Sequence, residues 1–114
     1  MKPLALAAVL VALAAGLAIA AEPEKAPPDP RDSGPDKIDI SSYPPEQQKR
    51  YPVFERKCSK CHPAARAINS RFNASEWKRY MKRMVRRPNA GVTDEQADDI
   101  YEFLKFYAVK LGVE

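Results

Sequence analysis

Both cysteines and the only histidine of this 114-residue chain lie within five consecutive positions, Cys58-Ser59-Lys60-Cys61-His62. A thioredoxin-like redox pair needs a strand before the first cysteine, and no strand pattern precedes Cys58. A zinc site needs four protein ligands, whereas this segment offers three, and two of them are adjacent. A disulfide between Cys58 and Cys61 would close a very short loop and leave His62 without a role. The motif therefore needs a group that uses all three side chains.

A histidine directly after Cys-x-x-Cys is typical of covalent haem attachment, in which both thiols add to porphyrin vinyl groups and the imidazole binds the iron. We predict one haem c, bound covalently by Cys58 and Cys61, with His62 as an axial ligand. The chain has no second histidine. A methionine thioether is the usual alternative for the sixth position, and Met81 and Met84 are the candidates.

Three segments together resemble the class I monohaem cytochromes c: CSKCH at 58–62, EWKRYMKRM at 76–84 and TDEQADDIYEFLKFYA at 93–108. The resemblance covers about residues 51–111 and implies an electron carrier with a small helical fold around the haem. In that family the methionine seven residues after a tryptophan is the ligand, which implies Met84 here and makes Met81 a haem-packing neighbour. The chain departs from the family at Pro52, where an uninterrupted helix is usual.

Hydrophobic periodicity predicts an all-α domain of three helices, at residues 45–61, 74–87 and 94–111, with loops at 63–72 and 87–92. Asn73 and Thr93 are the expected N-caps of the second and third helices. Gly112 is the expected stop after the third helix. Pro52 should kink the first helix or restart it, because proline removes a backbone hydrogen bond.

Several apolar side chains of these helices are expected to pack near the haem or in the core. Trp77, Tyr80 and Phe72 are predicted to pack on the haem. Tyr101 and Leu104 are predicted to pack against the first helix, close to Phe54. A large apolar cofactor would also help to stabilise a domain with so small a core.

The N-terminus has the pattern of a secretory signal peptide at residues 1–21, with Lys2 before a long uncharged run. The small residues of Ala18-Ile19-Ala20 predict cleavage near Ala20 or Ala21 and a periplasmic location. A retained membrane anchor is the alternative, because the run is just long enough to span a bilayer.

Residues 22–44 are rich in proline and acidic residues and contain few apolar side chains. Such a composition buries too little surface to offset its ordering entropy, so we predict an extended linker. The folded cytochrome c domain is then expected at residues 45–114.

Charge is unevenly distributed, with thirteen Lys or Arg and two acidic residues in the stretch 49–87 that holds the motif. A basic rim around a redox centre steers it towards acidic redox partners. Nucleic acid is the other use of a basic run, but an exported haem protein rarely meets it. We predict an electron-transfer protein rather than an enzyme. The alternative is a haem-based sensor of small ligands, or a peroxidase-like enzyme, with a weak or vacant sixth ligand.

Overall fold

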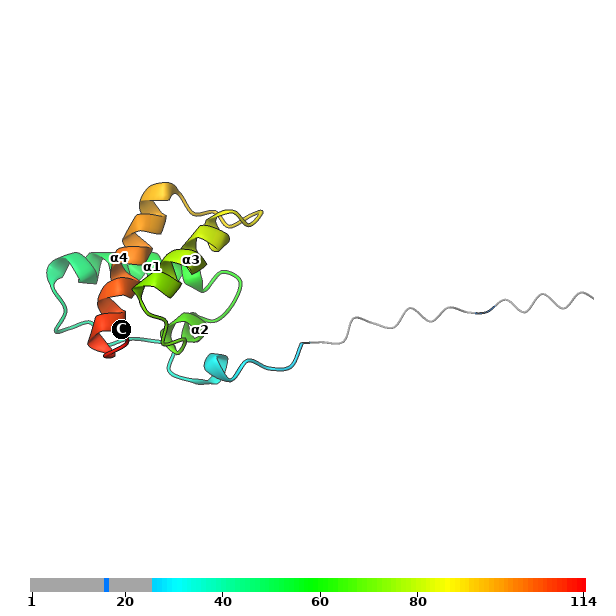
Figure 1. Ribbon diagram of the computed structural model, residues 1–114, viewed down its shortest axis with the longest axis horizontal. Helices are drawn as coiled ribbons and strands as arrows, with labels where there is room; N and C mark the ends of the chain where they lie inside the picture. Colours follow the sequence, from blue (N-terminus) through cyan, green and yellow to red (C-terminus); the bar gives the residue numbers. More distant parts are fainter. Residues whose placement is uncertain (1–15, 17–25) are drawn as a thin grey trace, which may run out of the picture.

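The computed structural model describes Gly16 and residues 26–114, and its arrangement is all-helical with no strand in that part of the chain (Figure 1). The elements are, in order, η1 (Pro30–Ser33), α1 (Pro45–Cys58), α2 (Ala64–Ile68), α3 (Ala74–Val85) and α4 (Asp94–Lys110). The predicted all-α class is confirmed. The predicted signal peptide lies outside the described residues, Gly16 aside, and so do residues 22–25 of the predicted linker. Within the described chain no helix combines the length and apolar character needed to cross a bilayer.

The ends of α3 and α4 follow from the capping residues seen in the sequence. Asn73 Oδ1 accepts a hydrogen bond from the Glu76 amide at 2.9 Å, which caps α3. Thr93 and Gln96 form a reciprocal capping box at the start of α4. Gly112 follows α4 with a φ of 70°, a left-handed conformation that glycine adopts without strain. These three predictions are confirmed.

Helix α1 runs on through Pro52, so of the two expectations, a kink or a restart, the restart is wrong. Proline removes one backbone hydrogen bond, and the Pro52 ring itself is exposed. The neighbouring Tyr51 and Phe54 are buried, and Phe54 is fully buried at 0% exposure. Their burial offsets the lost hydrogen bond. The helix ends at Cys58, three residues before the expected end at Cys61.

Helix α2 occupies part of the segment that we expected to be a loop. It has no side-chain cap, and Pro63 precedes it in an extended conformation. All of its residues except Arg66 are buried. The helix is therefore held by packing rather than by local capping.

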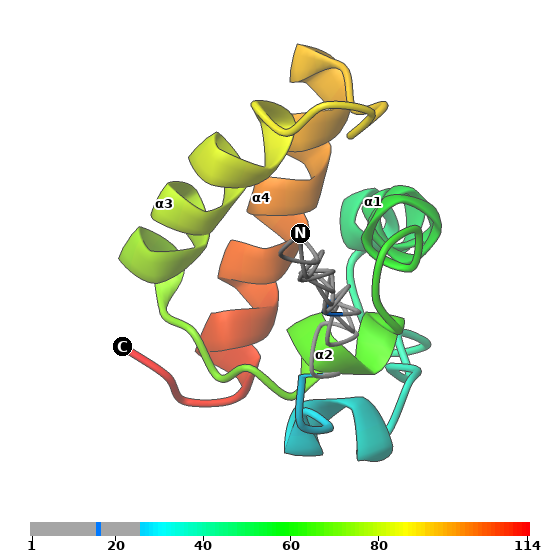
Figure 2. The ribbon, with the colours of Figure 1, turned by 90° about the vertical axis from the view of Figure 1, so that its right-hand side faces the viewer.

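Helix α4 forms the centre of the domain, with α1 and α3 packed against it on either side (Figure 2). The ring of Phe103 stacks on Phe54 with centroids 5.3 Å apart and lies 5.4 Å from the ring of Tyr51. Phe103 thus makes the contact with α1 that we expected from Tyr101. Tyr101 lines a groove on the α3 side of α4, together with Lys78 and Val85. Leu104 is fully buried, as expected of a core residue.

Residues 29–44 fold against the helices, unlike the extended linker that composition predicted. The Ile38 amide donates to the Tyr51 hydroxyl at 3.1 Å, and the ring of Tyr43 meets that of Phe106 edge-on at 5.0 Å. The turn η1 lies beside α2 (Figures 1 and 2). These contacts are made by residues far apart in the sequence, which composition does not reveal.

Candidate functional site

A cavity of about 340 Å³ lies between the end of α1, the start of α2 and the inner face of α3. Among the described helices, α1 and α3 both pack on α4, and the cavity is lined by residues of both α1 and α3. Its volume lies in the range of roughly 300–1,000 Å³ that is usual for small-molecule sites. Its lining comprises Lys57, Cys58, Lys60, Cys61, His62, Arg66, Ala67, Tyr80, Met81, Met84, Arg87, Pro88, Ala90, Val92 and Ile100.

Cys58, Cys61 and His62 all reach this cavity from one wall. Cys58 is the last residue of α1 and is half-buried, whereas Cys61 and His62 are exposed in the turn that follows. Pro63 disfavours a helical conformation at His62, which explains why α1 does not extend through the motif. The early end of the helix leaves the second thiol and the imidazole on a turn rather than on a helical face. No disulfide joins the two cysteines.

The Cys58 thiol lies in a largely apolar environment. Burial raises its pKa to about 12, because a thiolate is poorly solvated there. The thiol is therefore neutral near pH 7. A neutral, half-buried thiol is a poor ligand for a bare metal ion and a poor redox nucleophile.

Met81 and Met84 line the wall contributed by α3, one helical turn apart. Met81 is buried, with 8% of its surface exposed, and Met84 is half-buried. The structure therefore brings both candidate thioethers to the same cavity as the Cys-x-x-Cys-His motif. It does not by itself choose between them.

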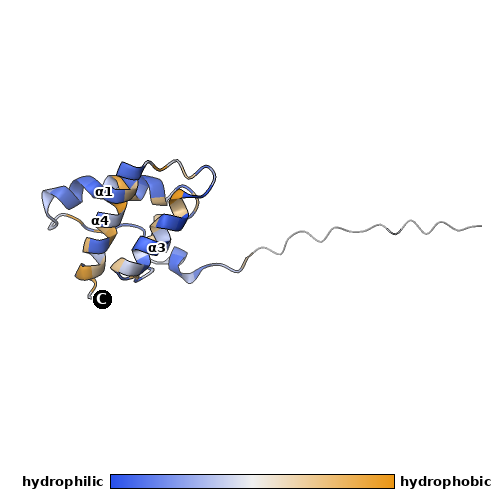
Figure 3. Ribbon diagram, turned by 45° about the horizontal axis from the view of Figure 1, so that its top comes forward, coloured by the Kyte–Doolittle hydropathy of each residue, from blue (hydrophilic) through white to orange (hydrophobic). Residues whose placement is uncertain are grey.

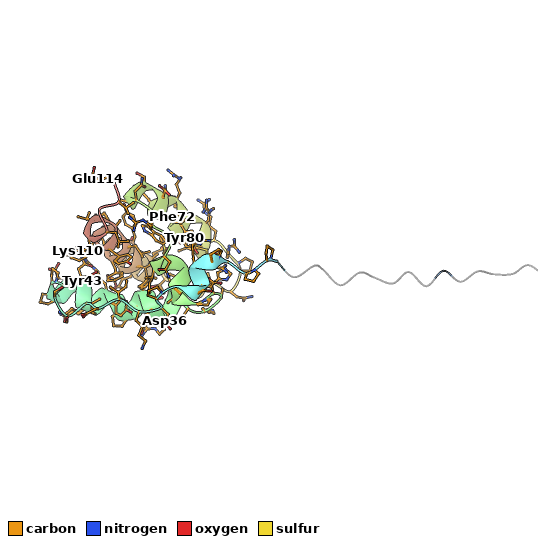
Figure 4. All side chains as sticks on the ribbon, turned by 90° about the horizontal axis from the view of Figure 1, so that it is seen from below. Asp36, Tyr43, Phe72, Tyr80, Lys110 and Glu114 are labelled. Carbon is orange, nitrogen blue, oxygen red and sulfur yellow. The ribbon has the colours of Figure 1, made fainter. Side chains whose placement is uncertain are left out.

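The aromatic residues that we expected at the haem divide into two groups. Tyr80 lines the cavity, whereas Trp77 and Phe72 do not. The indole of Trp77 is 2% exposed and lies behind Tyr80, with ring centroids 5.5 Å apart and the rings nearly perpendicular. The ring of Phe72 packs against both of these rings, with its centroid 4.9 Å from that of Trp77 and 6.1 Å from that of Tyr80. Figure 4 shows Phe72 and Tyr80 close together. Trp77 and Phe72 thus support the cavity wall from outside.

The loop at residues 86–92 forms a further wall, and two lysines of the motif region hold it. Lys57 Nζ donates to the Gly91 carbonyl and Lys60 Nζ to the Asn89 carbonyl, both at 2.7 Å. Asn89 and Gly91 have φ values of 63° and 64°, which bend the loop back over the cavity. The sequence did not predict these contacts, because nothing around Lys57 or Lys60 indicates which distant carbonyl groups their side chains bind.

Arginine side chains gather at the Tyr80 edge of the cavity. Arg66 and Arg87 line it directly. Burial is the main influence on the pKa of Tyr80 and raises it, while the positive charges of Arg31, Arg66 and Arg87 act in the opposite direction. This edge is the one best suited to negatively charged groups on a bound molecule.

The described side chains do not form a cluster of ligands for a bare metal ion. Across the part of the chain that the structure describes, no group of three or more His, Cys, Asp or Glu side chains gathers in a way that could hold one. A structural zinc ion needs four such ligands and a catalytic one three. The donors that line this apolar cavity are two thiols, one imidazole and two thioethers.

No family model, curated protein or solved structure matches the chain. The functional inference therefore depends on the residues of the cavity.

Proposed function

We propose that the protein is a small monohaem c-type cytochrome that carries single electrons between redox proteins. The observation that carries the proposal is the cavity itself, because it gathers Cys58, Cys61 and His62 on one wall and Met84 on another. These residues are separated by 22 positions or more from Met84 in the sequence, yet they line one space. A haem supplies one-electron redox chemistry at its iron, and the protein supplies attachment, ligands and docking.

Each cavity residue has a distinct role in this proposal. Cys58 and Cys61 would hold the porphyrin through thioether bonds, and His62 would bind the iron through a ring nitrogen. Met84 would supply the second protein ligand of the iron, and Met81 would pack beside it. Axial methionine raises the reduction potential relative to ligation by two nitrogens, because a thioether favours the reduced iron.

The surroundings of the cavity favour an acidic partner. Lys57, Lys60 and Arg87 line the cavity, and the adjoining outer face of α3 carries further exposed basic side chains, Lys78, Arg79, Lys82 and Arg83. Hydropathy colouring shows long hydrophilic stretches along α1 and α3 (Figure 3). A basic rim of this kind accelerates encounter with a negatively charged protein more than it tightens the complex. The charge supports a redox partner with an acidic docking surface.

The proposal is tested by producing the full chain in a host that exports and matures c-type cytochromes. We expect the purified protein to gain the mass of one haem, to have no thiol that reacts with alkylating reagents, and to undergo reversible one-electron reduction. Cys58→Ala together with Cys61→Ala should abolish covalent haem. Ser59→Ala, which changes the residue between them and removes none of the donors, is the matched control.

The absorption of the oxidised protein separates an electron carrier from a ligand sensor or peroxidase-like enzyme. The proposal expects the charge-transfer band of a methionine–iron bond and slow binding of carbon monoxide to the reduced protein. Absence of that band, with rapid carbon monoxide binding, would reject the carrier and favour an open sixth position. A protein that gains no haem in such a host would reject both.

A further inference from the structure

The N-terminal strap, defined as residues 29–40, is bound to α2 by a cluster of polar contacts. Arg66 donates to both carboxylate oxygens of Asp32, from Nε at 2.9 Å and from Nη2 at 2.6 Å. Arg31 donates from Nη1 to Ser70 Oγ at 2.9 Å. Asn69 Nδ2 lies 3.1 Å from the Arg31 carbonyl and 3.0 Å from that of Pro35. The strap therefore contacts α2 at its middle and at its end.

The close approach of the strap to α2 depends on a glycine. A Cβ added at Gly34 would lie 2.5 Å from Asn69 Nδ2, which is closer than real Cβ atoms come. Asp29 also caps η1 by accepting from the Arg31 amide at 3.0 Å. Local conformation and long-range contacts thus agree in placing the strap here.

The strap is connected to the cavity through Arg66 of α2. Arg66 binds the strap and also lines the cavity, and α2 begins two residues after His62. The Arg66 hydrogen bonds are the main reason that the pKa of Asp32 is lowered. Asp32 is therefore bonded to a residue of the cavity wall that lies four positions after His62.

We propose that Asp32 and Arg66 are positioning residues of the haem site: their ion pair fixes α2, and with it the turn that carries His62, and balances the charge at that edge of the cavity. This inference rests on the proposed function for its electronic part. Its structural part, that the ion pair fixes α2, does not depend on haem. Hydrogen exchange tests the structural part, and the midpoint potential of the iron tests the electronic part.

Hydrogen exchange tests the structural part. Asn69 and Ser70 directly follow α2, and their backbone amides donate to carbonyls of that helix, Asn69 to Ala65 and Ser70 to Ala67. We expect Asp32→Asn in the full-length protein to accelerate their exchange about two- to fivefold, the range for a partly exposed ion pair. Asp99→Asn is the matched control, because it removes the same kind of charge from the Arg50 pair on the α1–α4 side. Equal exchange in the two variants would overturn the structural part.

The midpoint potential of the iron tests the electronic part, with variants that have opposite expected signs. Arg66 also lies 3.5 Å from Asp29 Oδ2, which Arg31 binds as well. Asp32→Asn removes the closer of the two carboxylates that face Arg66, so the positive charge at this edge increases, which disfavours oxidised iron and should raise the potential. Arg66→Gln leaves the carboxylates uncompensated and should lower it. At a fixed applied potential each change should alter the ratio of oxidised to reduced protein about two- to fivefold. A purely structural loosening would shift both variants in the same direction, and that result would overturn the electronic part.

Arg66→Lys provides a variant that keeps the charge and loses the two-pronged hydrogen bond. It should accelerate exchange at Asn69 and Ser70 while leaving the potential close to that of the wild type. A shift in potential as large as that of Arg66→Gln would contradict the assignment of charge balance to Arg66. A wild-type protein without haem would refute the proposed function, and the exchange comparison would still decide whether Asp32 positions α2.

Discussion

Replacing Met84 and Met81 separately by leucine distinguishes the iron ligand from a packing residue. Leucine has nearly the volume of methionine but lacks the sulfur, so the exchange removes the donor and largely preserves the packing. Under the proposed function, Met84→Leu should abolish the methionine–iron absorption band of the oxidised protein. Met81→Leu should retain the band, since Met81 serves as wall rather than ligand.

Met84 should matter more for the absorption band, but Met81 should contribute more packing energy, because it is more deeply buried. Replacement of each by alanine tests this second order. Met81 is 8% exposed and lies in the wall of two hollows, the main cavity and a groove between α3 and α4 lined by Lys82, Ala97 and Tyr101. Removing a buried methionine side chain costs about 2–5 kcal/mol, and the hollows on either side place Met81→Ala near the low end. Met84 is half-buried. Its apolar contribution to the free energy of unfolding should be about half as large, near 1 kcal/mol.

Urea denaturation of the haem-loaded protein and the absorption spectrum of its oxidised form measure both effects on the same samples. The expected pattern is a spectral loss in both Met84 variants. The difference in stability between the leucine and the alanine variant measures packing without the iron ligand, and it should be larger at position 81 than at position 84. A band that disappears in Met81→Leu and persists in Met84→Leu would reverse the assignment. A band that persists in both would show that neither thioether binds the iron.

Three further predictions follow from the packing, the strap and the surface charge. Phe103→Ala should lower the free energy of unfolding in urea by about 3–5 kcal/mol, because the ring is fully buried and stacks on Phe54; a loss under about 1 kcal/mol would contradict the central place of α4. Hydrogen bonds from Arg66 lower the pKa of Asp32. The Asp32–Arg66 contact therefore stabilises the folded protein fully above the unfolded pKa of Asp32, about 3.9, and this stabilisation is lost as the pH falls through the lower pKa of the folded state. The side-chain amide resonances of Asn69 should therefore shift in acid, and a spectrum unchanged down to about pH 2 would refute the contact. Electron transfer to an acidic partner protein should slow as ionic strength rises, and a rate that does not depend on salt would remove the basic rim from the docking model.

The sequence predicted the elements whose cause is local. Asn73 and Thr93 are capping residues whose partners lie three positions away, so the starts of α3 and α4 could be read directly. Helix α2 could not, because Pro63 precedes it without a side-chain cap and its five residues are held by burial. An Ala-rich stretch after a proline was the available sign, and it is weak.

The strap escaped prediction for a different physical reason. Its composition favours disorder, and the contacts that order it join residues 34 to 39 positions apart, such as Asp32 with Arg66 and Arg31 with Ser70. Charge pairs at that separation leave no periodic pattern. The contact of α1 with Phe103 rather than Tyr101 has a similar origin. The two side chains point to nearly opposite sides of α4, about 200° apart, and only the positions of α1 and α3 around α4 decide which of them faces which helix.

The candidate site was predictable to the extent that its donors are close together in sequence. Cys58, Cys61 and His62 form one motif, and the spacing from Trp77 implied Met84. That these groups share a cavity is a property of the fold, as is the anchoring of the 86–92 loop by Lys57 and Lys60. The lysines come from the motif segment itself, so the wall above the cavity and the wall that bears the thiols are linked.

The position of the cavity suggests why a covalent cofactor suits this particular chain. The aromatic contacts of Tyr51, Phe54 and Phe103 join α1 to α4, and the buried Trp77 and Met81 lie on α3, the other partner of α4. The backbones of α1 and α3 do not approach each other closely within the described chain, and the fully buried Ile100 of α4 lines the cavity that both helices border. A flat apolar group bonded to Cys58 and ligated from Met84 would connect the two helices across that floor. Covalent attachment at α1 and ligation at α3 would then make the folding of the two halves cooperative, which a core of this size does not readily achieve by side chains alone.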